Sequence, residues 1–144
     1  MFFIEILGKV KQKNKVADFC ENVLLDLMPN VNRTVDIVVK FVTECDDQES
    51  GYCYGDNEEV IISIAKNSMG QSYTFDEQML ALCHELVHAK QIITGELNGK
   101  LWKGEVIAER SATSTPWEIE AFGLERPLFD KFYKTTFDSA IMFS

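Results

Sequence analysis

The spacing of two histidines and one glutamate predicts a metal site. His84, Glu85 and His88 form the pattern H-E-x-x-H, and these are the only two histidines among the 144 residues. On a helix, residues four positions apart lie one above the other, with about 5–6 Å between their Cβ atoms. Two imidazoles in that geometry can bind one metal ion, while the carboxylate between them stays near the open side of the metal. The pattern therefore predicts a zinc site, and a hydrolytic one.

The sequence around this pattern predicts a helix from about Thr74 to Gly95. Glu77 follows Thr74 by three residues, a spacing typical of a capping box, in which side chains and backbone satisfy each other's free groups. Gly95 stands where a residue with a left-handed conformation closes a helix. One side of the segment is apolar and carries Met79, Leu82, Cys83, Leu86, Val87 and Ile93. The pattern therefore lies in the helical context that the metal site requires.

The third metal ligand cannot be a histidine, because none remains. A carboxylate later in the chain is favoured, and Glu118 and Glu120 are both available. Thr115 and Glu118 have the spacing of a second capping box, with Pro116 at the first helical position, so Glu118 is expected to cap the helix. Glu120 points about 200° around the helix from Glu118. We therefore favour Glu120 as the third ligand, with Glu118 as the alternative.

These segments resemble the gluzincin group of zinc metallopeptidases in its compact, single-domain form. The resemblance rests on HELVHAKQ at residues 84–91, on Trp102 and Gly104, and on PWEIEA at residues 116–121. It covers about residues 76–124, and small metallopeptidase-like proteins of phages and bacteria have similar segments. In this family the glutamate directly before an alanine is the usual third ligand, which implies Glu120.

The resemblance implies hydrolysis of peptide bonds by a zinc-activated water molecule, with Glu85 as the general base. The implied metal ligands are His84, His88 and Glu120. A peptide or protein substrate would pair with an edge strand, which we expect at Val60–Ala65. The alternative is a zinc-binding module without catalytic activity in a larger protein assembly.

Hydrolysis also requires a donor that stabilises the negative charge developing on the carbonyl oxygen. Relatives use a histidine or a tyrosine, and no spare histidine exists in this chain. A tyrosine is therefore implied, and the sequence does not rank the four that are present. They are Tyr52, Tyr54, Tyr73 and Tyr133.

The composition is that of a soluble protein with one domain, residues 1–144. Hydrophobic residues make up 46% of the chain, and 14 basic against 23 acidic residues give a net charge of −9. This charge argues against a nucleic-acid partner. Four cysteines without C-x-x-C spacing favour free thiols over a disulfide framework. With neither a signal-peptide pattern nor a run of ~20 apolar residues, we expect a cytoplasmic protein without a membrane partner.

The remaining segments predict the elements that have to position the site. Apolar residues at intervals of three and four over Lys11–Met28 predict an amphipathic helix. Thr34–Glu44 is β-branched and largely apolar, which predicts a strand covered on both faces. Phe2–Leu7 is expected to be a first strand or a tail docked on the core, and Gly51–Gly55 a short strand or strand edge. Val60–Ala65 is expected to be a strand, and a last helix should run from Pro116 to about Tyr133. The predicted fold is α+β and zincin-like: a small mixed sheet on an N-terminal helix, a central HExxH helix and a C-terminal helix with the third ligand.

Overall fold

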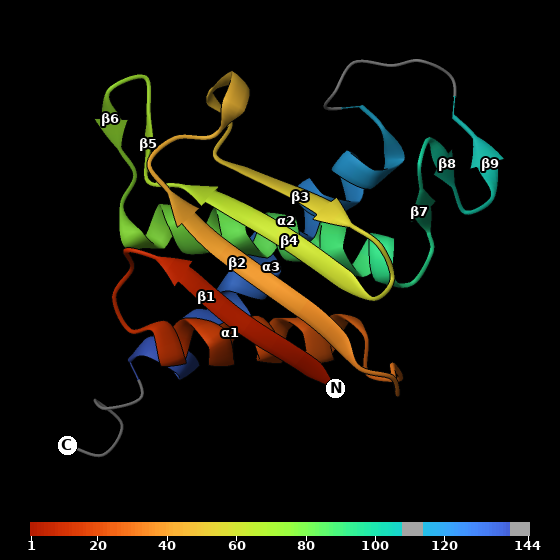
Figure 1. The fold of residues 1–144 in the computed structure, drawn as a ribbon, viewed down its shortest axis with the longest axis horizontal. Coiled ribbons are helices and arrows are strands. Elements are labelled where there is room, and N and C mark those ends of the chain that lie inside the picture. The colour runs from red at the N-terminus through yellow and green to blue at the C-terminus, as the bar shows by residue number, and fades with distance from the viewer. Residues whose placement is uncertain (108–113, 139–144) are drawn as a thin grey trace.

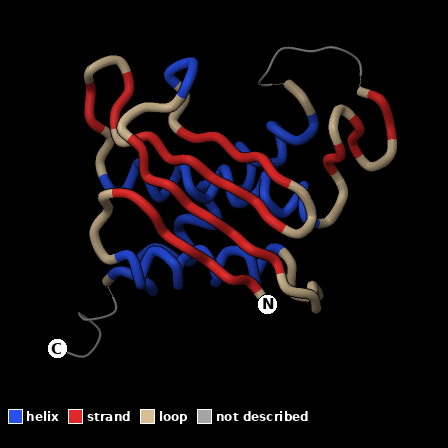
Figure 2. Tube along the Cα trace, viewed as in Figure 1, coloured by secondary structure: helices blue, strands red, loops and turns tan. Residues whose placement is uncertain are grey.

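The computed structural model describes residues 1–107 and 114–138. In that part of the chain, three helices lie on one side of a four-stranded sheet: two pack on the sheet, and the third packs on those two helices (Figures 1 and 2). The elements in chain order are β1 (Phe2–Gly8), α1 (Lys13–Leu27), β2 (Val35–Val42), a 3₁₀ turn (Asp46–Gln48), β3 (Gly51–Gly55), β4 (Glu59–Ala65), β5 (Asn67–Ser68), β6 (Gln71–Ser72), α2 (Phe75–Ile93), β7 (Leu97–Asn98), β8 (Leu101–Trp102), β9 (Glu105–Val106) and α3 (Pro116–Phe137). The α+β prediction is confirmed at this level.

The main sheet is mixed, with the strand order β1-β2-β4-β3. Strands β1, β2 and β4 run parallel, and β3 runs antiparallel to β4. Helix α1 makes the crossover that two parallel neighbours require. The hairpin β5–β6 leads into α2, and the small sheet β7–β8–β9 follows it (Figure 1). The expectation that Val60–Ala65 is an edge strand is wrong, because β4 lies between β2 and β3. The edge strands are β1 and β3, and β3 is the one that lies next to β4.

Burial alternates along the strands, because all three helices lie on the same face of the sheet. In β2, Val35, Ile37 and Val39 are fully buried, whereas Asp36 between them is exposed. The prediction that this strand is covered on both faces is therefore wrong. Tyr52 and Tyr54 of β3 are likewise exposed on the open face, about half of each side chain being accessible.

One hydrophobic core lies between the sheet and the helices. Its fully buried side chains include Phe19 and Leu24 of α1, Ile37 of β2, Ile62 of β4 and Met79, Leu82 and Leu86 of α2, and Leu128 of α3 joins them. Helix α2 packs against β3 and β4 on one side and against α3 on another. This central position confirms that the helix carrying the H-E-x-x-H pattern is part of the core.

The predicted boundaries of α2 are confirmed. The backbone N–H of Glu77 donates to Oγ1 of Thr74 at 3.1 Å, and the N–H of Thr74 donates to Oε1 of Glu77 at 2.8 Å, which completes the capping box. Gly95 has a φ of +81° just after the helix. Helix α3 continues through Pro127 to Phe137, four residues beyond the predicted end at Tyr133.

The four cysteines are free thiols, and Cys20 and Cys83 are buried in the core. Burial raises the pKa of both thiols far above the ordinary value. Among the described helices, none combines the length and the apolar character needed to cross a bilayer.

Gly8, the last residue of β1, lies close to the backbone of Phe41 in the neighbouring strand β2. Its φ is +93°, and an added Cβ would lie 2.2 Å from the backbone oxygen of Phe41. We expect Gly8→Ala to lower the free energy of unfolding by about 2 kcal/mol or more, because neither the backbone clash nor the strained φ can be relieved by a side-chain movement. Urea denaturation measures the loss.

The matched control is Gly123→Ala in α3, where an added Cβ meets no atom within 4 Å. Alanine favours a helix interior, so this variant should be more stable by up to about 1 kcal/mol. A Gly8→Ala protein as stable as the Gly123→Ala protein would contradict the close approach of β1 and β2 at Gly8.

Candidate metal centre

Three polar side chains from two helices meet at one point. His84 and His88 lie one turn apart on α2, and Glu118 lies in the first turn of α3. Nε2 of His84 is 3.1 Å from Oε1 of Glu118, and Nε2 of His88 contacts the same oxygen. One ligand atom of each residue lies within 4.8 Å of the other two. Two imidazole nitrogens and a carboxylate oxygen are a donor set for zinc that leaves a fourth position for water.

The structure brings Glu118 and not Glu120 to the two histidines, so the geometry favours Glu118, the alternative to Glu120, as the third ligand. The carboxylate of Glu120 instead accepts hydrogen bonds from Nζ of Lys90 at 3.2 Å and from Nε2 of Gln91 at 3.0 Å. The second capping box is absent: Thr115 makes no side-chain cap bond, and its buried hydroxyl has no hydrogen-bond partner among the described residues. Glu118 is therefore not engaged by the helix end and faces α2.

Gln91 holds His88 in place and was not identified from the sequence. Its side chain is fully buried, and its Oε1 lies 2.8 Å from Nδ1 of His88. Its Nε2 donates to the backbone oxygen of Trp117 and to Oε1 of Glu120, each at 3.0 Å. An amide oxygen only accepts hydrogen bonds, so Nδ1 of His88 carries a proton and Nε2 is directed at Glu118. The signal in the sequence is a polar residue three positions after His88 on a buried face of the helix.

His84 is held by contacts on the α3 side. Oε1 of Glu125 lies 3.7 Å from Nδ1 of His84, and the ring of Phe122 packs on the imidazole with the centroids 4.6 Å apart. The imidazoles of His84 and His88 are nearly perpendicular, with an interplanar angle of 80° and centroids 4.9 Å apart. Both ligand nitrogens are thus directed at one side of α2 by residues of α3 and by Gln91.

The carboxylate of Glu118 is ionised in this environment. Burial raises its pKa, but hydrogen bonds with His84 and His88 outweigh that effect and lower the pKa of Glu118 to about 2. Burial lowers the pKa of His88, and hydrogen bonds with Glu118 and Gln91 outweigh it, so the pKa of His88 is raised. The site therefore presents a negative oxygen to two imidazoles at neutral pH.

Glu85, the glutamate of the H-E-x-x-H pattern, lies between α2 and β3. Its side chain is 6% exposed, and burial raises its pKa to about 7, against the opposing effect of the two neighbouring histidines. A Cβ added to Gly51 would lie 3.0 Å from Cγ and from Oε2 of Glu85. The glycine at this position of β3 is what allows the strand to lie directly against the carboxylate.

The cluster opens into a pocket of about 550 Å³ between β3 and the start of α3. Of the four candidate tyrosines, Tyr52 borders this pocket. Tyr54 borders a different cavity, next to β7. The hydroxyl of Tyr133 donates to Asp76 at the start of α2, and Tyr73 precedes the same helix. Tyr52 is thus the one of the four that lines the pocket of the histidines, with its ring about half exposed on the open face of the sheet.

Comparisons of the chain with protein-family models, with curated protein sequences and with solved structures returned no match. The function has to be inferred from the residues and the geometry of the chain itself.

Zinc affinity distinguishes the roles of the two glutamates of α3. We expect Glu118→Gln to weaken zinc binding by about a hundredfold or more, because it removes the anionic ligand atom. Glu120→Gln, the matched control, should weaken it by less than about tenfold, because Glu120 acts only through Gln91. Competition with a coloured chelator measures both affinities, and equal losses would contradict the assignment of Glu118.

Gln91→Leu tests how His88 is oriented. Leucine nearly preserves the buried volume but leaves Nδ1 of His88 without an acceptor, so zinc affinity should fall by about 10- to 100-fold. Gln78→Leu is the control, since the side chain of Gln78 donates to the backbone oxygen of Tyr73 and to no other described residue. A folded Gln91→Leu protein that binds zinc as tightly as the Gln78→Leu protein would show that Gln91 does not position the ligand.

Proposed function

We propose that the protein is a zinc-dependent metallopeptidase. The observation that carries the proposal is that a single oxygen, Oε1 of Glu118, faces Nε2 of both His84 and His88. Two nitrogen lone pairs and an anionic oxygen repel one another unless cations lie between them. Two separate protons could serve this purpose, but one divalent ion satisfies all three atoms, and zinc prefers this donor set.

Zinc held by these residues would supply a water molecule of pKa near ~7 and polarise the carbonyl group of a bound peptide. Glu85 is placed to act as the general base, because it follows His84 directly and lines the same pocket. Its carboxylate would accept the proton of the attacking water and return it to the leaving amine. A pKa of about 7 for Glu85 suits a group that both accepts and releases a proton at neutral pH.

A peptide substrate would pair with β3. The pairing with Val60–Ala65 that the sequence predicts would not be available, because β4 is an inner strand. Strand β3 is one of the two outer strands of the sheet, and it is the one that forms a wall of the pocket. The free edge of such a strand offers N–H and C=O groups to an extended chain. Tyr52 of this strand is the candidate donor to the oxyanion, because it alone of the four candidate tyrosines borders the pocket.

The arrangement also supports a zincin-like fold of the gluzincin kind, with residues 1–144 as one domain acting on a peptide or protein in the cytoplasm. An antiparallel edge strand lies beside the helix with the two histidines, and the helix after it carries the third ligand. The position of that ligand departs from the family pattern, in which the glutamate before alanine would be used.

The test of catalysis is Glu85→Gln in the zinc-loaded protein. We expect the variant to keep one bound zinc ion and to lose about 10²- to 10⁴-fold in the rate of peptide cleavage, because the amide cannot accept the proton of the water. Mass spectrometry of a broad peptide library measures cleavage, with Glu105→Gln, an exposed site on β9, as the matched control.

Full cleavage by Glu85→Gln would contradict the role of Glu85. Zinc bound by the wild-type protein without cleavage of any library peptide would favour the alternative, a zinc-binding module without catalytic activity.

A further inference from the structure

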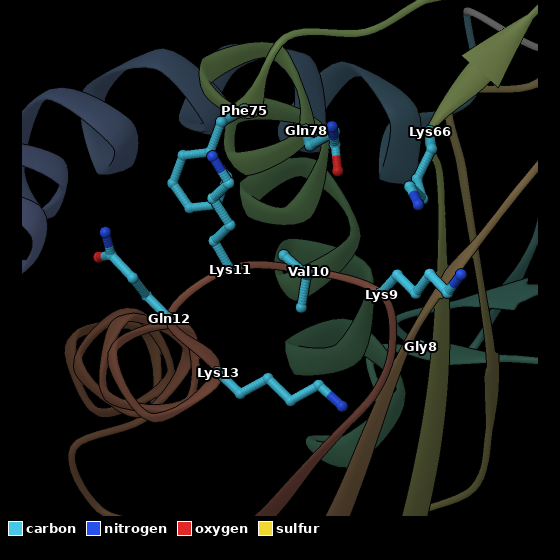
Figure 3. A pocket seen from close by; sticks show the side chains of 9 residues that line it. All are labelled: Gly8, Lys9, Val10, Lys11, Gln12, Lys13, Lys66, Phe75 and Gln78. Carbon is cyan, nitrogen blue, oxygen red and sulfur yellow. The ribbon is translucent and has the colours of Figure 1, made fainter.

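A second pocket, lined by four lysines, lies where β1 and β4 end and α1 and α2 begin. Its volume is about 820 Å³, and its cationic lining residues are Lys9, Lys11, Lys13 and Lys66. Figure 3 shows the β1–α1 loop crossing the pocket, with Lys66 pointing toward it and Lys11 rising toward Phe75 of α2. This lysine pocket shares no lining residue with the pocket of the metal centre.

The charge of the lysine pocket opposes that of the whole chain. The four lysines belong to only 14 basic residues in a protein with a net charge of −9. No carboxylate lines the pocket, and none of the four lysines makes an ion pair with a residue that the structure describes. By contrast, Lys90, Lys103 and Lys131 all pair with acidic side chains. Like charges on four lysines around one cavity repel one another, and a bound anion would reduce that repulsion.

The first turn of α1 adds to the positive field in the lysine pocket. Its N-cap residue Gln12 makes no side-chain cap bond, and no acidic residue stands in the first turn, which begins with Lys13. The free N–H groups and the positive end of the helix dipole therefore lie beside the lysines. Helix α2, which also begins at this pocket, satisfies its own end with Thr74 and Glu77.

The size and the apolar part of the pocket define the class of ligand. A volume of about 820 Å³ is within the range of small-molecule sites, and Val10 and Phe75 supply apolar surface beside the lysines. A long polyanion such as a nucleic acid would extend from the pocket onto the acidic remainder of the surface. We propose that the lysine pocket binds a phosphorylated small molecule, with its phosphate among the four lysines and its apolar part against Val10 and Phe75.

Titration of the ¹⁵N-labelled protein with inorganic phosphate, pyrophosphate and adenosine monophosphate, followed by amide chemical shifts, tests this proposal. We expect saturable shifts at residues 9–13 and at Lys66, with adenosine monophosphate binding more tightly than inorganic phosphate. Binding should weaken as salt is raised, because the lysines are accessible to screening ions. Since phosphate can also bind zinc, shifts confined to the metal centre would count against the lysine pocket.

The decisive variant is Lys9→Gln combined with Lys66→Gln. It should weaken binding by about tenfold or more, because two charged donors to phosphate are lost. Lys100→Gln combined with Lys103→Gln makes the same change in net charge at β7–β9 and should leave binding unchanged. Equal weakening by both pairs, no saturable shift with any of the three probes, or tighter binding of a polyglutamate peptide than of adenosine monophosphate would overturn the proposal. The outcome does not depend on whether the metal centre cleaves peptides.

Discussion

The sharing of one carboxylate oxygen by two imidazoles constrains how α2 and α3 pack. Glu118, His84 and His88 are largely withdrawn from water, with side-chain exposures of 23%, 12% and 12%. Polar groups buried in this way are stable only if their charges are balanced and their hydrogen bonds are made. The cluster therefore requires cations between the helices, and Gln91 fixes the direction from which His88 meets them. The protonation of His88 and the proposed metal site both depend on this contact between α2 and α3.

Helix α2 supplies both the histidines and the base of the proposed chemistry, and all three side chains line one pocket. The histidines face α3, where Glu118 completes the ligand set, and Glu85 faces β3, where Gly51 leaves room for its carboxylate. An amphipathic helix exposed to solvent could not do this, because Glu85 would then keep an ordinary pKa. Burial between a sheet and a helix raises that pKa, and the edge position of β3 leaves the same region open to an extended peptide. The fold thus supplies both a desolvated base and a free strand edge.

The sequence predicted the features that depend on neighbouring residues. The boundaries of α2 follow from the box formed by Thr74 and Glu77, and the pairing of His84 with His88 follows from helical spacing alone. Local reasoning missed the placement of Glu118: a capping bond contributes only about 1 kcal/mol, and the two imidazoles that the carboxylate meets lie 30 residues or more away in the sequence. The edge position of β3 was also missed, because strand order depends on pairing between distant segments. Gln91 was not identified because two of its three partners, Trp117 and Glu120, lie on α3.

Anomalous diffraction at the zinc absorption edge, from crystals of the zinc-loaded protein, tests the central claim most directly. The account predicts one zinc peak about 2.0–2.2 Å from Nε2 of His84, Nε2 of His88 and a carboxylate oxygen of Glu118. Glu120 should remain bonded to Lys90 and Gln91. A zinc ion bound by Glu120 or by a cysteine thiolate, or the absence of a zinc peak between α2 and α3, would contradict it.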